Sequence, residues 1–279
     1  MTAATGESDA DAYPPEHHLL RDLALDVQHH NDGSSAAWLR VVPELFDDTG
    51  AVRAGVIATM VDMIGGGLAA QAAAPNWIAT ADLTLHLVRS VTGGTIEATA
   101  RVLRAGRTTV VIEVALRGHD TAVGTATMTF SVLPRRDDNP VITFAADTPR
   151  TTLVLPGSGF RAPVLDALDV TVVDAAAGVV DVPVTDYSRN SLGALQGGVV
   201  AIAIDAAAEH ALRAACGTPV RVADMQLTYL ALVRGTLRTT TEVVHASPSF
   251  GSALVDVVDI GGESRRTTTA RVTATREVG

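Results

Sequence analysis

Two stretches of this chain repeat one pattern of residues at a fixed separation. Each begins with a polar turn, passes through a glycine where a helix is expected to start, and ends in an apolar helix that carries one aspartate. The corresponding positions lie 143 residues apart and are Gly50 and Gly193, Gly55 and Gly198, and Asp62 and Asp205. An interval that recurs along the pattern indicates an internal duplication. We therefore expect two similar domains.

Each half is predicted to place a long helix ahead of four strands. Apolar residues recur at helical spacing over 56–71, and runs rich in β-branched residues, separated by glycine-containing turns, follow both helices. One helix against an antiparallel sheet is an α+β arrangement. Strands are expected over 78–88, 95–103, 108–116 and 122–132, then 170–173, 178–184, 220–233, 236–245, 252–260 and 267–274, with the second helix over 197–215.

Composition along the chain suggests the domain boundaries. Residues 1–16 are small, polar and acidic, without the features of a secretory signal, and we expect a disordered tail there. The first domain is predicted over 17–134 and the second over 162–279. Between them, 135–161 is rich in proline, glycine and charge and reads as a linker, with one short strand expected near 141–144.

Charge and cysteine content exclude several classes of function. A net charge of −10 argues against nonspecific nucleic-acid binding, which needs an excess of lysine and arginine. Asp62 and Asp205 interrupt the longest apolar runs, so no membrane span is predicted. Cys216 is the only cysteine, which excludes an internal disulfide and fits a cytoplasmic protein. The histidine pairs have no partners at metal-ligand spacing, so no metal site is predicted.

The helix starts carry the chemistry. Glycines at the first helical positions leave backbone N–H groups unshielded, and the helix dipole adds partial positive charge there. Such a site stabilises a carbonyl oxygen that gains negative charge, as in acyl transfer. An aspartate in an apolar helix is costly to bury unless it is paired. Asp62 and Asp205 are therefore either functional or bonded across the interface between the two domains.

These residues resemble a known family, the hotdog-fold thioesterases, and most closely the phenylacetate-pathway type of small acyl-CoA thioesterase. The family pattern is Asn-x-x-Gly-x-x-His-Gly-Gly, with an aspartate seven positions after the last glycine. The second half carries Asn190, Gly193, Gln196-Gly197-Gly198 and Asp205, with glutamine in place of histidine. The first half departs further, with Asp47, Arg53 and Ala54 at the corresponding positions. The resemblance implies two tandem hotdog domains, each a long central helix wrapped by an antiparallel sheet, packed as an intramolecular pseudo-dimer.

In that family each active site is shared between two domains, and the resemblance implies two unequal sites here. Asp62 and Thr80 would face Asn190, Gln196 and Gly197 in a complete site, where Gly197 N–H binds the oxyanion and Asp62 is the base or nucleophile. Thr80 would orient Asp62 or water, and Asn190 would either set the turn or donate to the carbonyl oxygen. In the other site Asp205 would face Asp47, Arg53 and Ala54, with Val222 at the hydroxyl position. That site is expected to be degenerate.

The resemblance also implies the substrate, an acyl-CoA thioester that is hydrolysed without a cofactor. Gly198 is expected to contact the substrate, and the candidates for the coenzyme A phosphates are Arg104, Arg107, Arg234 and Arg238. Two alternatives stay open. The missing histidine favours a non-catalytic acyl-CoA binding protein to some extent, but the completeness of the first site counts against it. An enoyl hydratase is disfavoured, since no aspartate–histidine pair precedes either helix. Further homo-oligomerisation is undetermined.

Overall fold

The computed structural model describes residues 13–135, 148–262 and 264–276. Both halves have the predicted α+β order. The first half comprises α1 (Leu19–Asp22), β1 (Asp26–His29), β2 (Ser34–Arg40), the short 3-10 helix η2 (Pro43–Leu45), α2 (Ala54–Ala73), β3 (Trp77–Leu87), β4 (Thr95–Ala105), β5 (Thr109–Gly118) and β6 (Thr121–Leu133). The second comprises β7 (Thr151–Thr152), α3 (Val164–Ala167), β8 (Thr171–Asp174), β9 (Val179–Pro183), α4 (Gly197–Cys216), β10 (Arg221–Tyr229), β11 (Thr236–Ser247), β12 (Phe250–Asp259) and β13 (Arg266–Thr275).

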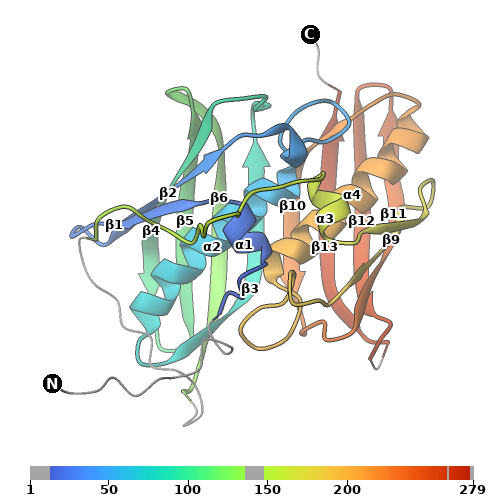
Figure 1. Ribbon diagram of the computed structural model, residues 1–279. Coiled ribbons are helices and arrows are strands. Elements are labelled where there is room, and N and C mark those ends of the chain that lie inside the picture. The colour runs from blue at the N-terminus through green and yellow to red at the C-terminus, as the bar shows by residue number, and fades with distance from the viewer. Residues whose placement is uncertain (1–12, 136–147, 263, 277–279) are drawn as a thin grey trace, which may run out of the picture.

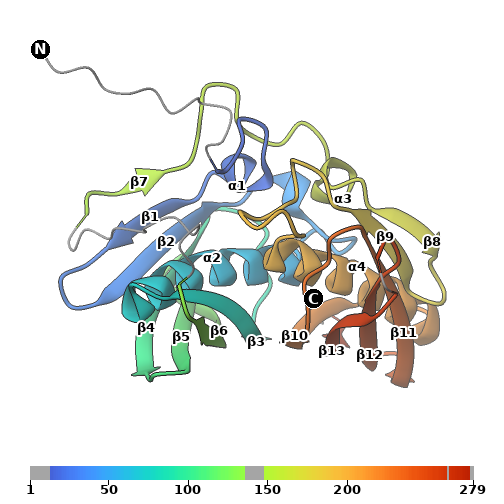
Figure 2. The ribbon, with the colours of Figure 1, turned by 90° about the horizontal axis from the view of Figure 1, so that it is seen from below.

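The two halves share one sheet. Its strand order is β7-β1-β2-β4-β5-β6-β3-β10-β13-β12-β11-β9-β8, so the halves meet where β3 pairs with β10 in antiparallel register (Figure 1). Figure 2 shows α2 and α4 on the same concave face of this curved sheet, one behind each half. The predicted tandem hotdog fold, with an intramolecular pseudo-dimer, is confirmed.

Helix α2 is long and apolar enough to cross a membrane by length and composition alone. Its place in the fold accounts for that composition. Val56, Met60, Ile64 and Leu68 are buried in the core, and the small residues between them let the sheet approach closely. At Gly65, for example, an added Cβ would lie 2.9 Å from the Met128 sulfur on β6. The helix is apolar on most of its surface because the sheet and α4 cover most of it.

Helices α2 and α4 contact each other at a glycine near the start of each helix, and the two contacts are related by the internal symmetry. A Cβ added to Gly55 would lie 2.5 Å from the Cα atom of Ile202, and one added to Gly198 would lie 2.5 Å from the Thr59 side chain. Thr59 and Ile202 are themselves 143 residues apart, so the duplicated positions pair with one another across the interface. Each helix therefore begins against the second turn of the other, which sets the depth of every side chain between them.

Three details differ from the sequence-based expectations. Strand β10 ends at Tyr229 and does not run on to Val233, because Leu230 and Ala231 turn away with their N–H groups bonded to the Thr267 carbonyl. Residues 13–16 of the expected tail lie against the first domain, where the Arg21 guanidinium donates to the carbonyls of Pro14 and Pro15. Within the expected linker, β7 pairs with β1, while 141–144 lies outside the described residues.

Two glycine-to-alanine variants of α2 test the helix contact. Gly55→Ala is expected to destabilise the protein by roughly 1–3 kcal/mol, because its Cβ meets backbone atoms of α4. Gly67→Ala has its nearest neighbour 4.0 Å away and is expected to stabilise by about 0.5–1 kcal/mol, the usual gain of alanine over glycine in a helix. Urea unfolding of both variants measures the difference. Equal stabilities would contradict the close approach of α2 and α4.

Candidate active site

A cavity of about 430 Å³ opens between the two halves, beside the start of α4. Residues of β3, β6 and α2 line one side, and the start of α4 with the loops before it and after β10 lines the other. Most of the lining is apolar. The polar residues of the complete predicted site all reach it: Asp62, Thr80, Asn190, Gln196 and Gly197. The structure thus brings together side chains that are far apart in the sequence.

Asp62 projects from the third turn of α2 toward the start of α4. The Thr80 hydroxyl on β3 donates to Asp62 Oδ1 at 3.0 Å. Asp62 Oδ2 lies 3.0 Å from where a Cβ on Gly197 would be, so any side chain at 197 would press on the carboxylate. Burial raises the pKa of Asp62 to about 6, against the opposing effect of the Thr80 hydrogen bond. Near neutral pH the group is therefore ionised but poised to take a proton.

The start of α4 offers free donors beside this carboxylate. Gln196 precedes the helix in extended conformation and provides no side-chain cap. The first intrahelical bonds run from Val199 and Val200 to its carbonyl, so the N–H groups of Gly197 and Gly198 lack intrahelical acceptors. Neither N–H has an acceptor elsewhere among the described residues. The N–H of Gly197, which lines the cavity, can therefore donate to a bound oxygen atom.

Gln196 occupies the position of the family histidine and is buried. Its amide nitrogen donates to the Met63 sulfur at 3.5 Å, while Oε1 is buried without a hydrogen-bond partner in the described part of the chain. A buried acceptor without a donor costs free energy. The amide oxygen therefore suits a water molecule or a substrate N–H as its partner.

The structure favours one of the two roles considered for Asn190. Its Oδ1 accepts from the N–H groups of Leu192 at 2.9 Å and Ala194 at 3.1 Å, which closes the turn. Asp47 closes the matching turn in the first half by accepting from Thr49 and Ala51. Because both turns need only an acceptor oxygen, aspartate replaces asparagine there without structural consequence.

Tyr229 is a site residue that the sequence did not single out. It lies at the end of β10, lines the cavity, and donates its hydroxyl to the Gly197 carbonyl at 3.0 Å. Burial raises the pKa of Tyr229 further above its ordinary value, so it remains a neutral donor. Leu87 ends β3 at the corresponding place, so only this site has the hydroxyl. The sequence predicts one strand over 220–233, so it does not indicate that Tyr229 is the last residue of β10.

Only some of the expected substrate-binding residues lie near the cavity. Arg234 lies on the loop after β10 and donates to the Leu192 carbonyl at 3.1 Å, at the edge of the cavity. Arg104 and Arg107 belong to the β4–β5 hairpin and do not line the cavity, although that hairpin lies at the same end of the sheet. Arg238 pairs with Asp181. Gly198 packs on Thr59 rather than lining the cavity, so its bare Cα serves helix packing.

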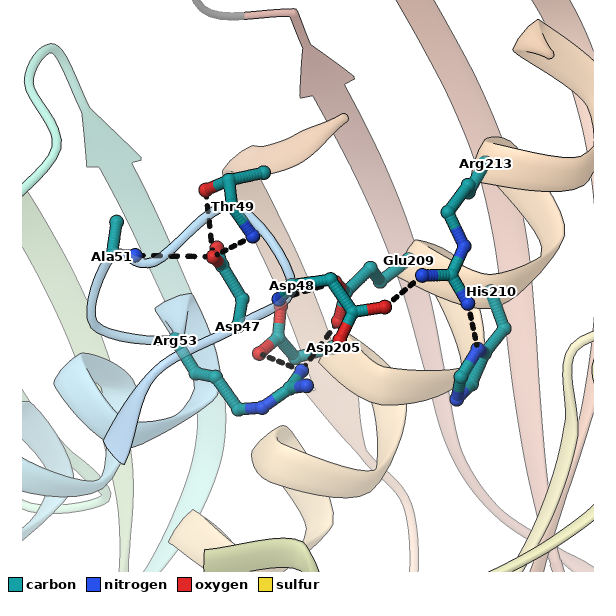
Figure 3. A network of polar contacts seen from close by, with 9 residues as sticks. All are labelled: Asp47, Asp48, Thr49, Ala51, Arg53, Asp205, Glu209, His210 and Arg213. Carbon is teal, nitrogen blue, oxygen red and sulfur yellow. Dashed lines mark hydrogen bonds and ion pairs between the residues drawn. The ribbon is translucent and has the colours of Figure 1, made fainter. Parts of the chain in front are cut away.

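At the second predicted site, an arginine fills the space in front of the helix start (Figure 3). Arg53 precedes α2 as Gln196 precedes α4. Its Nη1 lies 2.6 Å from Glu209 Oε2 and 3.7 Å from Asp205 Oδ2, with all three side chains at most 5% exposed. The guanidinium thus contacts the aspartate that corresponds to Asp62. A substrate carbonyl cannot occupy the same position.

The network continues outward and joins the halves. The Asp48 N–H donates to Glu209 Oε1 at 3.1 Å, and the Asp48 carboxylate pairs with Arg213. Burial raises the pKa of Asp205 to about 7, with Arg53 opposing the shift, and burial likewise raises the pKa of Glu209. Two carboxylates thus share one guanidinium, and a proton on Asp205 relieves their repulsion.

Substituting the two arginines one at a time compares the stability contribution of the buried ion pairs with that of the exposed one. Arg53→Met is expected to cost about 3–5 kcal/mol, since it leaves two buried carboxylates without a cation. Arg213→Ala removes a partly exposed ion pair and is expected to cost less than about 1 kcal/mol. Chemical denaturation at pH 8 measures both. Similar small losses would show that Arg53 is not the centre of the network.

Comparison with known proteins agrees with this geometry. The family model described as the Thioesterase superfamily matches residues 49–125 and 192–265. No curated protein sequence matches the chain. An acyl-ACP thioesterase from Bacteroides thetaiotaomicron is 13% identical, with a TM-score of 0.59 over 87% of this chain and 98% of that chain.

Two further solved structures are similar. A conserved protein with a hot dog fold from Alicyclobacillus acidocaldarius is 15% identical, with a TM-score of 0.61 over 94% of this chain and 99% of that one. The tesB protein of Mycobacterium avium subs paratuberculosis is 14% identical, with a TM-score of 0.58 over 87% and 93%. At such identities the likeness to these proteins is one of fold.

The family match rests on both halves. Each matched segment contains one of the duplicated helices and strands of the sheet behind it, and together the segments cover more than half of the chain. The chain therefore belongs to the Thioesterase superfamily, as a tandem hotdog protein and a thioester hydrolase.

Proposed function

We propose that this protein hydrolyses an acyl-CoA thioester to the free acid and coenzyme A at one composite site between its halves. The observation that carries the proposal is the position of Asp62 from α2 beside Gly197 at the start of α4, both on one largely apolar cavity. A carboxylate and a free helix-start N–H are the two groups that thioester hydrolysis needs.

The geometry gives each group a role. The thioester carbonyl oxygen accepts a hydrogen bond from the Gly197 N–H, which stabilises the negative charge that develops there. Asp62 either takes a proton from the attacking water or attacks the carbonyl carbon itself to form an anhydride. In the first route Asp62 passes that proton to the sulfur as the carbon–sulfur bond breaks, which releases the free acid and the coenzyme A thiol. In the second route the carbon–sulfur bond breaks to release the coenzyme A thiolate, which takes a proton from water, and a water molecule then hydrolyses the anhydride to the free acid and the Asp62 carboxylate. The Gln196 amide has no acidic proton to give up, so it can orient water but cannot act as the acid.

The cavity suits an acyl chain. Its lining includes the partly exposed leucines Leu133, Leu192, Leu230 and Leu232. Apolar surface around a reactive carboxylate favours an acyl group over a polar one. Arg234 is placed at the rim for a phosphate, and Arg104 and Arg107 lie on a hairpin at the same end of the sheet.

Thiol release from a panel of acyl-CoA thioesters tests the proposal. Asp62→Asn is expected to lower kcat by roughly a hundredfold or more, the usual scale for loss of a general base. Asp205→Asn is the matched control, because Asp205 faces Arg53 rather than a cavity, and its activity is expected to stay within about twofold of wild type. Thermal melts check folding. Loss of activity only in Asp205→Asn would reverse the assignment of the sites.

The same panel separates this function from its alternatives. Binding of acyl-CoA without turnover would make the protein a non-catalytic acyl-CoA binding protein. Turnover of acyl groups on a carrier protein, with none on coenzyme A, would replace the proposed carrier.

The pH dependence tests the role of Asp62. If Asp62 acts as its carboxylate, kcat/KM rises with pH through about 6, where that group loses its proton. The Thr80 hydrogen bond lowers the pKa of Asp62, so Thr80→Val is expected to move this acid limb to higher pH. Thr228→Val, which removes a hydroxyl from Asp82 outside the cavity, is the control and is expected to keep the wild-type limb. An unmoved limb in Thr80→Val would contradict the Thr80–Asp62 pairing.

A further inference from the structure

Because the chain is duplicated, each residue of one half can be compared with its counterpart in the other. One pair of counterparts outside the proposed thioester site differs in charge. On β12, Asp259 pairs with Leu237, and on β5 Gly118 pairs with Ile96 in the same register. The neighbouring loops agree, since Val184 donates to the Gly235 carbonyl as Val41 donates to the Gly94 carbonyl, both at 2.9 Å. Gly118 therefore stands where the second half has an aspartate.

The Asp259 carboxylate accepts hydrogen bonds from the backbone of the neighbouring loops. Its side chain is buried, and Oδ2 accepts from the N–H groups of Arg234 at 2.8 Å and Gly235 at 3.2 Å. Oδ1 accepts from Gly261 at 3.2 Å. The carboxylate thus satisfies three backbone donors that would otherwise lack partners.

In the first half, Gly118 has no carboxylate to offer, and a cavity of about 280 Å³ lies there. The loop is one residue longer than its counterpart, and Gly94 has a φ of +79°. Its lining contains no aspartate or glutamate among the described residues: Arg89, Ser90, Val91, Thr92, Gly93, Gly94, Gly118, His119, Thr121 and Val123.

Hydrogen-bond donors meet in this cavity without acceptors. Ser90 Oγ is inaccessible to solvent and has no hydrogen-bond partner in the described chain. The N–H groups of Gly93 and Gly94 also have no acceptor among the described residues, and Arg89 lines the same cavity. The His119 ring lies directly against Gly94. Arg89 and Gly94 are exposed and Gly93 is half-buried, so a bound acceptor can reach these donors.

A neighbouring cavity shares Gly94 and His119 with this one and does contain carboxylates. Glu97 and Asp120 line a neighbouring cavity together with Trp38 and Arg117. Glu97 accepts from the Trp38 indole N–H at 3.1 Å. Neither carboxylate lines the cavity beside Gly118.

We propose that the cavity beside Gly118 is a binding site for the carboxylate group of a small organic acid, which takes the place that Asp259 fills in the second half. Arg89 supplies the counter-charge, and the backbone N–H groups of Gly93 and Gly94 supply hydrogen bonds. Backbone N–H groups of a glycine-containing loop commonly form such anion sites. The site is separate from the thioester cavity, with which it shares no lining residue.

Amide NMR spectra of the full-length protein test the site with acetate as the probe, at constant ionic strength against chloride. Saturable shifts of the Gly93 and Gly94 N–H signals are expected with acetate and not with chloride. The variant Arg89→Ala is expected to weaken acetate binding by about tenfold or more. Absence of saturation would overturn the proposal, and tighter saturation by inorganic phosphate would overturn its choice of a carboxylate.

A tethered carboxylate gives a second test that needs no ligand. Gly118→Asp restores the residue found at 259, while Gly118→Ala adds the same Cβ, 3.1 Å from the Val123 side chain, without the charge. Gly118→Asp is expected to melt at a higher temperature than Gly118→Ala and to lose the acetate response. A Gly118→Asp protein that folds but is no more stable than Gly118→Ala, or that still binds acetate, would contradict the site.

Discussion

The contact between α2 and α4 determines the rest of the molecule. Because Gly55 and Gly198 have no side chains, each helix starts against the other, and the first turn of one reaches the aspartate of its neighbour. The carboxylate of Asp62 and the free N–H of Gly197 come together for this reason and not through any local sequence signal. Larger residues at the two glycines would separate the helices and with them Asp62 and Gly197.

The two halves use this one geometry for different ends. Before α4 stands a neutral glutamine, and the position on α2 that matches Glu209 is Gly66, so the space around Asp62 stays open. Before α2 stands Arg53, which Glu209 and Asp205 hold in place. The same backbone thus carries a cavity at one helix start and a buried ion-pair network at the other. Two residues, Arg53 and Glu209, account for most of that difference.

Most of the fold could be predicted from the sequence, because the repeated spacing, the apolar helices and the glycine-marked hairpins are local signals. The pairing of Asp62 with Thr80 and the start of α4 followed only from the family resemblance. Tyr229 was missed because a loop of apolar residues continues β10 without a break in pattern. Glu209 was missed because a glutamate on a helix ordinarily faces solvent. Both depend on contacts between distant segments, which spacing does not encode.

Joining the two domains in one chain has a consequence for how the sites could diverge. In a symmetric homodimer every substitution occurs twice, so an arginine that blocks one site blocks both. Here Arg53 and Glu209 close one site while Gln196 and Gly66 keep the other open. The shared sheet across β3 and β10 holds the unequal halves in register. Within one chain the two helix starts can therefore differ, and here one holds a buried ion-pair network while the other borders an open cavity.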